Sequence, residues 1–482
     1  MEDILDGFKK LQFQNDIRKI MITAQEIFEK KAEKVAFDLE HRRKINYNIS
    51  RYNDAVIKGK EQYTQLELAK ERAANRKSKV INDLDKYLIE FETNFTRKGG
   101  KVIWAENSAE AIWEIIRIFS KNDISRVVKS KSMITEEIDL NEQLEKNNIE
   151  SLETDLGEYI VQLDHDKPYH IITPAMHKSK EDIAELFNSK FNIPIESTPE
   201  EITSFVRGLL REKFITANAG VTGVNFLIAD IGAVAITENE GNALMSVSFP
   251  KIHIAIAGIE KIIPSLEDLH IFWPLLATHG TGQNITVYNS ILSGPRQKGE
   301  KDGPEEMYVI LLDNGRSTLL GKKEQRSALT CIRCGACLNA CPVYKNIGGH
   351  TYATTYSGPI GAVISPHFLG MEKYRHLSFA SSLCGKCSEV CPVKINLHEL
   401  LLLNRNESVK EGYYKNMDKW SMWGWKKIML KRKYMDMGTS GLKNFMLNKF
   451  FKKTWGSRRQ LPMISEKSFK QLWQEQHPHH KS

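Results

Sequence analysis

Seven cysteines confined to residues 331–391 constrain this 482-residue chain more than any other feature. Four have the spacing C-x2-C-x2-C-x3-C, three have the spacing C-x2-C-x3-C, and a proline follows each run. They are Cys331, Cys334, Cys337 and Cys341, then Cys384, Cys387 and Cys391. Structural zinc is the alternative, but zinc is usually held by two separated pairs of ligands. Four closely spaced thiols before a proline are typical of iron–sulfur proteins, so the sequence predicts iron–sulfur clusters.

The fourth cysteine of such a run binds the other cluster in two-cluster proteins. This rule predicts one [4Fe–4S] cluster on Cys331, Cys334, Cys337 and Cys391, and a second on Cys341, Cys384 and Cys387. Ser381 stands where the second run would have its first cysteine. The fourth ligand of the second cluster therefore stays open. It is an oxygen of Ser381 or Ser382, a water or outside group, or no ligand at all, as in a three-iron cluster.

Composition places the chain among globular proteins of two or three domains, with 41% hydrophobic and 27% charged residues. No stretch approaches the roughly 18 apolar residues of a membrane-spanning helix. Residues 1–6 lack the basic start and apolar core of a signal peptide. The cysteines lie in one stretch and are not spread out as a disulfide framework would be. We therefore expect a cytoplasmic protein.

Positive charge is concentrated in the C-terminal part. Residues 404–482 contain 18 Lys and Arg against 6 Asp and Glu, whereas the whole chain has a net charge of +8. Trp420, Trp423 and Trp425 lie among these basic residues. Such a segment suits docking onto an acidic partner, a solvated basic helix face, or peripheral contact with an anionic membrane. Nucleic acid is the least favoured ligand, and we expect residues 477–480 to be disordered.

Helices are predicted for residues 1–98, where apolar residues recur at spacings of three and four. The basic run 70–79 is interpreted as a solvated helix face. From residue 101 short strands alternate with amphipathic helices, which indicates an α/β domain with a largely parallel sheet. The predicted units are strand 101–104, helix 109–119 capped by Ser108, strand 126–129, helix 136–146 capped by Thr135, strand 169–172, and a helix from Ser179.

The middle of the chain is rich in strands and punctuated by glycine. Strands are predicted at 226–230, 232–237, 253–257 and 307–312, with a helix at 267–278 kinked near Pro274 and a loop at 279–284. No G-x-G-x-x-G or G-x4-G-K-[ST] motif is present, so dinucleotide and P-loop chemistry have no support. Tyr352, Tyr356 and residues 358–361 are expected to pack around the clusters. A helix after Cys391 is expected to shield the first cluster.

Several polar side chains lie near predicted strand ends, where open α/β sheets bind ligands. The candidate cations for a carboxylate are Lys129, Lys131, His177 and Lys178, and the candidate carboxylates are Asp155, Glu158, Asp230, Glu238 and Glu240. For each of them a role as a helix cap or turn residue is the favoured interpretation. His253 is interpreted as a core histidine because its strand is apolar. His279, in a glycine-rich loop, is the better candidate for a functional histidine.

Several segments of the chain resemble a known protein family. Segments similar to the lactate-utilisation domain are 153–163, 217–225, 240–242, 281–283 and 293–296. Together with the cysteine runs, Gly-Pro-Ile-Gly at 358–361 and the basic tail, nearly the whole chain resembles the lactate utilisation protein B family. The resemblance implies a sugar-phosphate-isomerase/CoA-transferase-like α/β domain followed by an α-helical ferredoxin-like two-cluster domain, with helical N-terminal and C-terminal extensions. It also implies that the missing eighth cysteine is a family trait.

This family supplies the iron–sulfur subunit of a bacterial three-part system that oxidises L-lactate. The resemblance therefore implies two partner subunits and a downstream electron acceptor. We expect an electron-transfer subunit, and not a stand-alone enzyme, in a complex that oxidises L-lactate to pyruvate and passes electrons through both clusters. Because the chain has no flavin or nicotinamide signature, oxidation itself is expected at a partner or a shared interface.

Two other functions fit the pattern less well. One is the iron–sulfur subunit of a glycolate-type or heterodisulfide-type oxidoreductase. The other is a small-molecule-binding or acyl-transfer enzyme with structural clusters. The predicted domains are a helical extension at 1–98, the α/β lactate-utilisation domain at 99–318, the iron–sulfur domain at 319–412 and the basic extension at 413–482.

Overall fold

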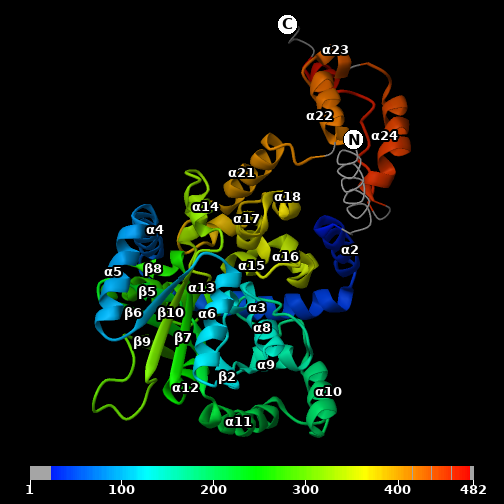
Figure 1. The fold of residues 1–482 in the computed structure, drawn as a ribbon. Helices are drawn as coiled ribbons and strands as arrows, with labels where there is room; N and C mark the ends of the chain where they lie inside the picture. The colour runs from blue at the N-terminus through cyan, green and yellow to red at the C-terminus, as the bar shows by residue number, and fades with distance from the viewer. Residues whose placement is uncertain (1–22, 415, 436, 457–458, 478–482) are drawn as a thin grey trace, which may run out of the picture. The chain divides into compact units, whose positions relative to one another are not determined.

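The computed structural model describes residues 23–477 except 415, 436, 457 and 458 (Figure 1). The first part of the predicted N-terminal extension and the predicted disordered end beyond residue 477 lie outside the described residues. The chain divides into two compact units, Met1–Glu411 and Gly412–Ser482. The four-part domain division stays a prediction.

A six-stranded sheet forms the centre of the first unit, and every neighbouring pair of its strands is parallel. The spatial order is β1 (Lys101–Ala105), β10 (Glu306–Leu312), β7 (Ile252–Gly258), β4 (Ala219–Gly223), β2 (Arg126–Lys129) and β3 (Glu150–Glu153). The prediction of an α/β domain with a parallel core is confirmed. Both faces of the sheet are covered, as parallel sheets require.

Alternation along the central strands divides the core into two layers. In β7, Ile254 and Ile256 pack on one face with α6 (Ser108–Lys121), whereas Ala255 and Ala257 pack on the other. Successive side chains of a strand point to opposite faces, so this division follows from the strand period of two. The first layer also includes residues of α7 (Met133–Glu137) and α8 (Leu140–Lys146). A third core joins α9 (Leu156–Leu163), α10 (Lys180–Phe191) and α11 (Pro199–Thr216).

A second sheet has four strands in the order β8 (Ile262–Ile263), β5 (Phe226–Ile228), β6 (Ala233–Glu238) and β9 (Tyr288–Leu292). β6 is antiparallel to both β5 and β9. The strands predicted at 226–230 and 232–237 are therefore present, but they form this sheet and not the parallel one. α12 (Asn242–Ser248) and α13 (Leu269–Thr281) complete this part of the chain.

The N-terminal helices pack against the same core. They are α2 (Ala24–Ala36), α3 (Leu39–Lys60), α4 (Leu66–Asn82) and α5 (Leu84–Arg97). The interpretation of 70–79 as a solvated face is wrong for Lys70 and Lys77, which are both buried. Lys77 is 1% exposed, and its ammonium donates to the carbonyl oxygens of Glu260 at 2.6 Å and Ile262 at 3.1 Å. Lys77 shares a helix face with Ala73 and Val80, but no local pattern could reveal its partners, which lie more than 180 residues along the chain.

Short helices surround the cysteines. They are α14 (Arg316–Leu320), α15 (Ala336–Ala340), α16 (Pro342–Ile347), α17 (Gly358–Leu369), α18 (Met371–Tyr374), α19 (His376–Phe379), α20 (Lys386–Glu389) and α21 (Leu397–Lys410). The 3-10 turns in unit one are η1 (Ile259–Lys261), η2 (Leu266–Asp268), η3 (Arg326–Thr330) and η4 (His350–Tyr352). This part contains no strand among its described residues, and Leu338 and Tyr352 join the main core. The predicted α-helical character is confirmed.

Three local predictions are wrong. Residues 169–172 form bends and not a strand, because their groups pair with the cysteine-rich part: the Tyr344 hydroxyl donates to the Tyr169 carbonyl at 2.9 Å. Asn107, and not Ser108, caps α6 by accepting from the Glu110 amide. Thr135 lies inside α7, which a left-handed residue at 139 separates from α8.

A fourth difference concerns the loop predicted at 279–284. Residues 279–281 continue α13, which ends where Gly282 adopts a φ of 78°. Pro274 lies inside this helix, as predicted.

A chain of buried ion pairs ties the cysteine region to the parallel sheet. Arg316 Nε lies 2.6 Å from one Glu260 oxygen, and Arg333 Nη2 lies 3.3 Å from the other. Arg316 also contacts both oxygens of Glu137, each at 2.8 Å. The side chains of Arg316 and Glu260 are each 1% exposed. Burial by itself raises the pKa of Glu260, but the two guanidinium groups lower it to about 2.

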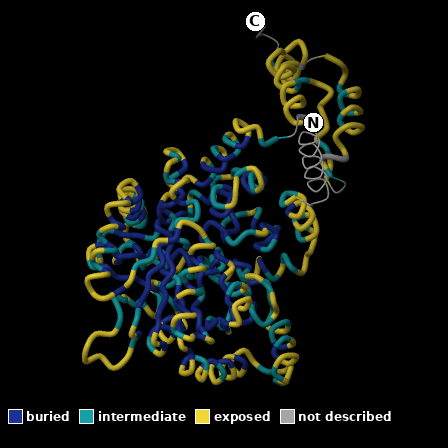
Figure 2. Tube along the Cα trace, in the orientation of Figure 1, coloured by how far each residue is buried: buried dark blue, intermediate teal, exposed yellow. Residues whose placement is uncertain are grey.

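The second unit contains α22 (Asn416–Met429), α23 (Arg432–Met435), α24 (Ser440–Trp455) and α25 (Phe469–Gln476). None of its residues whose side chains the structure describes is buried, and Figure 2 shows this unit mostly in the colour of exposed residues. Trp420 is 69% exposed and Trp423 is 56% exposed. Within the described ranges, no helix combines the length and the apolar character that a membrane crossing needs.

The buried ion pairs predict a large effect of Glu260→Gln. Removing one partner leaves uncompensated buried charge, which costs about 3–5 kcal/mol. The thermal unfolding midpoint of the cluster-loaded protein should fall by on the order of 10 °C. Glu306→Gln is the matched control, because Glu306 pairs with Lys101 at 2.7 Å on the surface. Its effect should stay below about 1 kcal/mol. Equal midpoints for the two variants would contradict the role of Glu260.

Candidate iron–sulfur centres and the adjoining cavity

Four cysteines from both runs line one small buried cavity. They are Cys331, Cys334, Cys337 and Cys391. Apolar residues, among them Ile171, Ile332 and Leu397, complete its wall. Leu397 begins α21, so the helix expected after Cys391 does cover this site. The structure therefore brings together the four residues predicted for the first cluster, and their role as ligands stays a prediction.

Backbone geometry allows the cysteine loop to approach its neighbours. Gly335 has a φ of 77°, a region that favours glycine. A Cβ at this position would lie 3.0 Å from Cδ1 of Ile172. The amides of Arg333 and Ile395 donate to the sulfurs of Cys331 and Cys391, each at 3.4 Å. Amide donors of this kind stabilise negative charge on sulfur.

The remaining cysteines are less enclosed. Cys341 is partly exposed, Cys384 is exposed and Cys387 is buried. The Cys387 thiol has its pKa raised by burial and then by the neighbouring Cys341 and Cys384. Ser381 is half-buried, and its hydroxyl oxygen accepts from the Leu383 amide at 3.1 Å. Ser382 is exposed.

The sulfur environment fits iron–sulfur clusters. Burial and then neighbouring sulfurs raise the pKa of both Cys334 and Cys337, and burial raises the pKa of Cys391 to about 11. Such crowded thiols stay protonated unless a cation binds them, and bound metal ions deprotonate thiols. Nη1 of Arg333 is also buried without a hydrogen-bond partner among the described residues. It is a donor beside the cysteines that a cluster sulfide can accept from.

A much larger cavity of about 530 Å³ adjoins this site, and Arg333 and Cys334 line both. The larger cavity lies at the carboxyl ends of the parallel strands. Its lining includes residues 130–132 after β2, Asp155 after β3, Gly223 at the end of β4 and Gly258 at the end of β7. β2 and β4 are neighbours, yet the chain leaves β2 toward β3 on one side and returns to β4 on the other. Open α/β sheets bind ligands at such a reversal of strand order.

The charged groups of this cavity are of both signs. Lys131, Lys261 and Arg333 supply positive charge, whereas Glu238 and Glu240 supply carboxyl groups together with Asp155. Burial, and then Arg333, lowers the pKa of Lys261 to about 8. Burial, and then Asp155, raises the pKa of Glu240 to about 7. The predicted candidates Lys131, Asp155, Glu238 and Glu240 therefore share one cavity.

Other predicted candidates lie elsewhere. Lys129 is buried 2.6 Å from Glu153 and 3.0 Å from Glu136. Although burial opposes its charge, these carboxylates raise its pKa. Glu158 belongs to the same buried group, where burial and Glu153 raise its pKa. The group of carboxylates is thus already neutralised in part by a lysine.

The remaining candidates have structural roles. The Asp230 carboxylate accepts from the Leu266 amide. His253 is buried with Nε2 2.8 Å from the Thr222 hydroxyl, as expected for a core histidine. The prediction that His279 lies in a loop is wrong: it is buried in α13 beside the Leu275 carbonyl.

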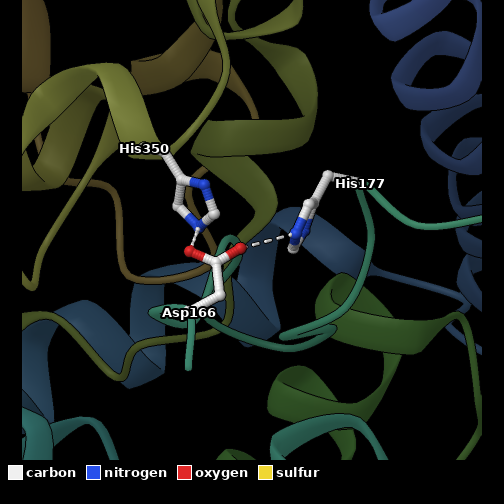
Figure 3. Close-up of side chains that lie close together, drawn as sticks. All are labelled: Asp166, His177 and His350. Atoms are coloured by element: carbon white, nitrogen blue, oxygen red, sulfur yellow. Dashed lines mark hydrogen bonds and ion pairs between the residues drawn. The ribbon is translucent and has the colours of Figure 1, made fainter. Parts of the chain in front are cut away.

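His177 and Lys178 lie outside the cavity. Figure 3 shows His177 and His350 on either side of Asp166. His177 Nε2 lies 3.0 Å from one carboxylate oxygen, and His350 Nε2 lies 3.8 Å from the other. Burial raises the pKa of Asp166, but the two histidines lower it to about 2. These groups join the loop before α10 to the cysteine-rich part, and Lys178 forms an ion pair with the same loop.

The sequence analysis missed Lys261 and Arg333. Lys261 follows the predicted strand 253–257 by only a few residues, so the rule that ligands bind beyond strand ends could have identified it. Arg333 stands between two predicted ligands, and its position beside a cluster could have been inferred from the C-x2-C spacing. Their convergence on one cavity depends on long-range packing, which no local pattern contains.

Comparison with known proteins agrees with this architecture. A LUD domain model matches residues 88–312, and a 4Fe-4S dicluster domain model matches residues 327–395. The chain thus has a LUD domain with a parallel α/β core followed by a domain for two iron–sulfur clusters. A crystal structure of a DUF162 family protein from Deinococcus radiodurans aligns with 48% of this chain and 98% of its own, at 13% identity and a TM-score of 0.28.

Curated relatives cover most of the chain. Lactate utilization protein B of Bacillus licheniformis is 48% identical over 335 residues, which are 69% of this chain and 70% of the relative. The proteins of that name from Bacillus velezensis and Bacillus subtilis have the same identity and coverage. At this identity and coverage, the chain belongs to the lactate utilization protein B family.

Proposed function

We propose that this chain is the iron–sulfur electron-transfer subunit of a complex that oxidises L-lactate to pyruvate. The observation that carries the proposal is the pair of cysteine sets in a chain whose relatives are named for lactate utilization. Thiolate-bound clusters exchange one electron at a time when they are bound. The chain supplies the thiolates, encloses the first set more fully than the second and leaves Cys384 of the second set exposed.

We propose the crossed ligand assignment for the two sets. The first set is Cys331, Cys334, Cys337 and Cys391, and the second is Cys341, Cys384 and Cys387. The shared cavity of the first set supports this assignment. The electrostatic neighbours of Cys387 are Cys341 and Cys384, which supports the second set.

The two sets differ in exposure, and this difference gives the relay a direction. Cys334 of the first set lines the large cavity, whereas Cys384 of the second set is exposed to solvent. Electrons therefore enter at the first set and leave from the second toward the acceptor. Arg333 balances negative charge at the entry, and the Cys331 and Cys391 sulfurs accept backbone hydrogen bonds there.

Paired cysteine variants test the ligand assignment. Cys387→Ala and Cys391→Ala lie in the same run, yet they should remove different clusters, and each should lower iron content by about half. Cys337→Ala should give the same electron paramagnetic resonance spectrum as Cys391→Ala. If each run instead held its own cluster, Cys387→Ala and Cys391→Ala would lose the same signal and Cys337→Ala another. That result would overturn the crossed assignment.

The relay predicts reduction of both clusters by lactate only when the partner subunits are present. The measurement is an anaerobic titration of the purified complex with L-lactate, followed by electron paramagnetic resonance, with iron and sulfide counted beforehand. D-lactate and the isolated chain with L-lactate are the controls. Spectra that stay unchanged in the complete complex while pyruvate accumulates would show that the clusters do not relay electrons.

We infer that the second unit docks onto an acidic face of a partner subunit. Lys427 lies 5.6 Å from the ring centroid of Trp423 in α22, so this helix presents aromatic and positive groups together. Neither residue is buried, which leaves both available for contact. Charge complementarity of this kind accelerates and orients association.

A charge-reversed variant tests this docking. Lys426→Glu combined with Lys427→Glu should weaken capture of the partner subunits about tenfold, and more strongly at low salt than at high salt. Lys180→Glu on the first unit is the control. Iron content should not change in either variant. If the wild-type chain floats with anionic lipid vesicles and the variant does not, while partner capture is equal, the surface binds membrane and not protein.

A further inference from the structure

The large cavity contains a cation that no group of the described chain neutralises directly. Lys261 ends the turn η1, just after β7, and lines the cavity. Its ammonium has no hydrogen-bond or ion-pair partner among the described residues, although Glu260 lies near enough to favour its charge. The other two cavity cations each have a partner, although Nη1 of Arg333 has none among the described residues. Lys131 donates to the Ile172 carbonyl, and Arg333 pairs with Glu260.

Lys77 is a buried lysine that can be compared with Lys261. Its ammonium is satisfied by two carbonyl oxygens at 2.6 and 3.1 Å. Lys261 lacks such acceptors, is only half-buried and lines the cavity near Arg333. Two neighbouring cations, one of which has no protein partner, make this part of the cavity suited to an anion.

We propose that the cavity binds the carboxylate of a small 2-hydroxy or 2-oxo acid, with Lys261 as the anchoring cation. The proposal rests on the proposed function, because it places the acid beside the set of cysteines through which electrons enter. The site lies at the reversal of strand order between β2 and β4, where sheets of this kind bind ligands.

The acidic residues of the lining orient the acid. Asp155, Glu238 and Glu240 also line the cavity, and they would repel a carboxylate. Oε2 of Glu240 accepts from the Leu156 amide at 3.1 Å, which holds that carboxyl in place. The acid therefore binds with its carboxylate toward Lys261 and its hydroxyl or carbonyl group toward the carboxyl groups. This orientation keeps the carboxylate of the ligand away from the carboxyl groups of the protein.

The volume determines the selectivity that we expect. Pockets of about 300–1,000 Å³ hold drug-sized ligands, and this cavity is about 530 Å³. A three-carbon acid occupies only part of it. The site should therefore recognise the class of acid by charge and should discriminate weakly by chain length.

The test is binding of pyruvate and of oxamate, a non-reacting analogue, to the full-length, cluster-loaded chain under anaerobic conditions. Isothermal titration calorimetry gives the dissociation constant, alone and with the partner subunits. Saturable binding of both probes to the wild-type chain is expected. Lys261→Met should weaken binding about tenfold or more, because a charge-assisted contact is lost. Lys261→Arg should restore most of the affinity.

Lys180→Met is the matched control, because Lys180 is a surface residue outside the cavity and is 75% exposed. Its affinity should equal that of the wild type. Iron content and thermal unfolding midpoints of all variants show whether a loss of binding reflects misfolding. Lys261→Met that retains iron and midpoint but binds the probes as the wild type does would overturn the assignment of Lys261. Absence of saturable binding to the wild type, with and without partners, would overturn the site.

The outcome is separable from that of the electron relay. If lactate reduces the clusters in the complete complex but Lys261→Met changes neither binding nor the lactate concentration needed, the relay stands and this site fails. If the acids bind through Lys261 while the clusters stay unreduced, the site stands and the relay fails.

Discussion

The buried carboxylate of Glu260 is the interaction on which this structure depends. Its two oxygens receive Arg316 and Arg333, and its backbone carbonyl receives the ammonium of Lys77. One residue thereby joins an N-terminal helix, the end of the parallel sheet and the loop between the first two cysteines. Each charge is tolerable in the interior only because the others are present. The cysteine-rich part is for this reason built into the α/β part and is not attached as an independent module.

This junction explains why the two cavities share a wall. Arg333 can reach Glu260 only if the cysteine loop lies against the carboxyl ends of the strands, and there Arg333 and Cys334 line both cavities. The ligand-binding edge of the sheet and the first cysteine set are thus brought together by the same contact. A ligand bound in the larger cavity would therefore lie beside the first cysteine set. Tyr356, which donates to Glu137 at 2.6 Å and lies under Arg333, closes the same wall.

Local chemistry determined what could be predicted from the sequence. The cysteine spacing predicts clusters because most ligands of one cluster come from a single short run with fixed spacing, and the buried strands are visible as apolar runs. The segment 169–172 has the same apolar character, but its groups pair with Tyr344 and Gly335 approaches it, so it is no strand. Lys77 lies on the buried face of α4, but only tertiary packing gives it its acceptors and leaves Lys261 facing a cavity.

The unequal exposure of the two cysteine sets suggests a reason why the second set lacks a fourth cysteine. Ser381 stands where a cysteine would complete the second set, and its hydroxyl oxygen is engaged by the Leu383 amide while its carbonyl accepts from Arg405 at 3.0 Å. Cys384 is exposed on the same segment. A complete set of thiolates would enclose the second cluster more fully and would add negative charge there. A cluster held by three thiolates, one of them exposed, would be open to an approaching acceptor, whereas the first set has three buried cysteines and borders the cavity. The missing thiolate therefore fits the exit end of a relay better than it fits its entry.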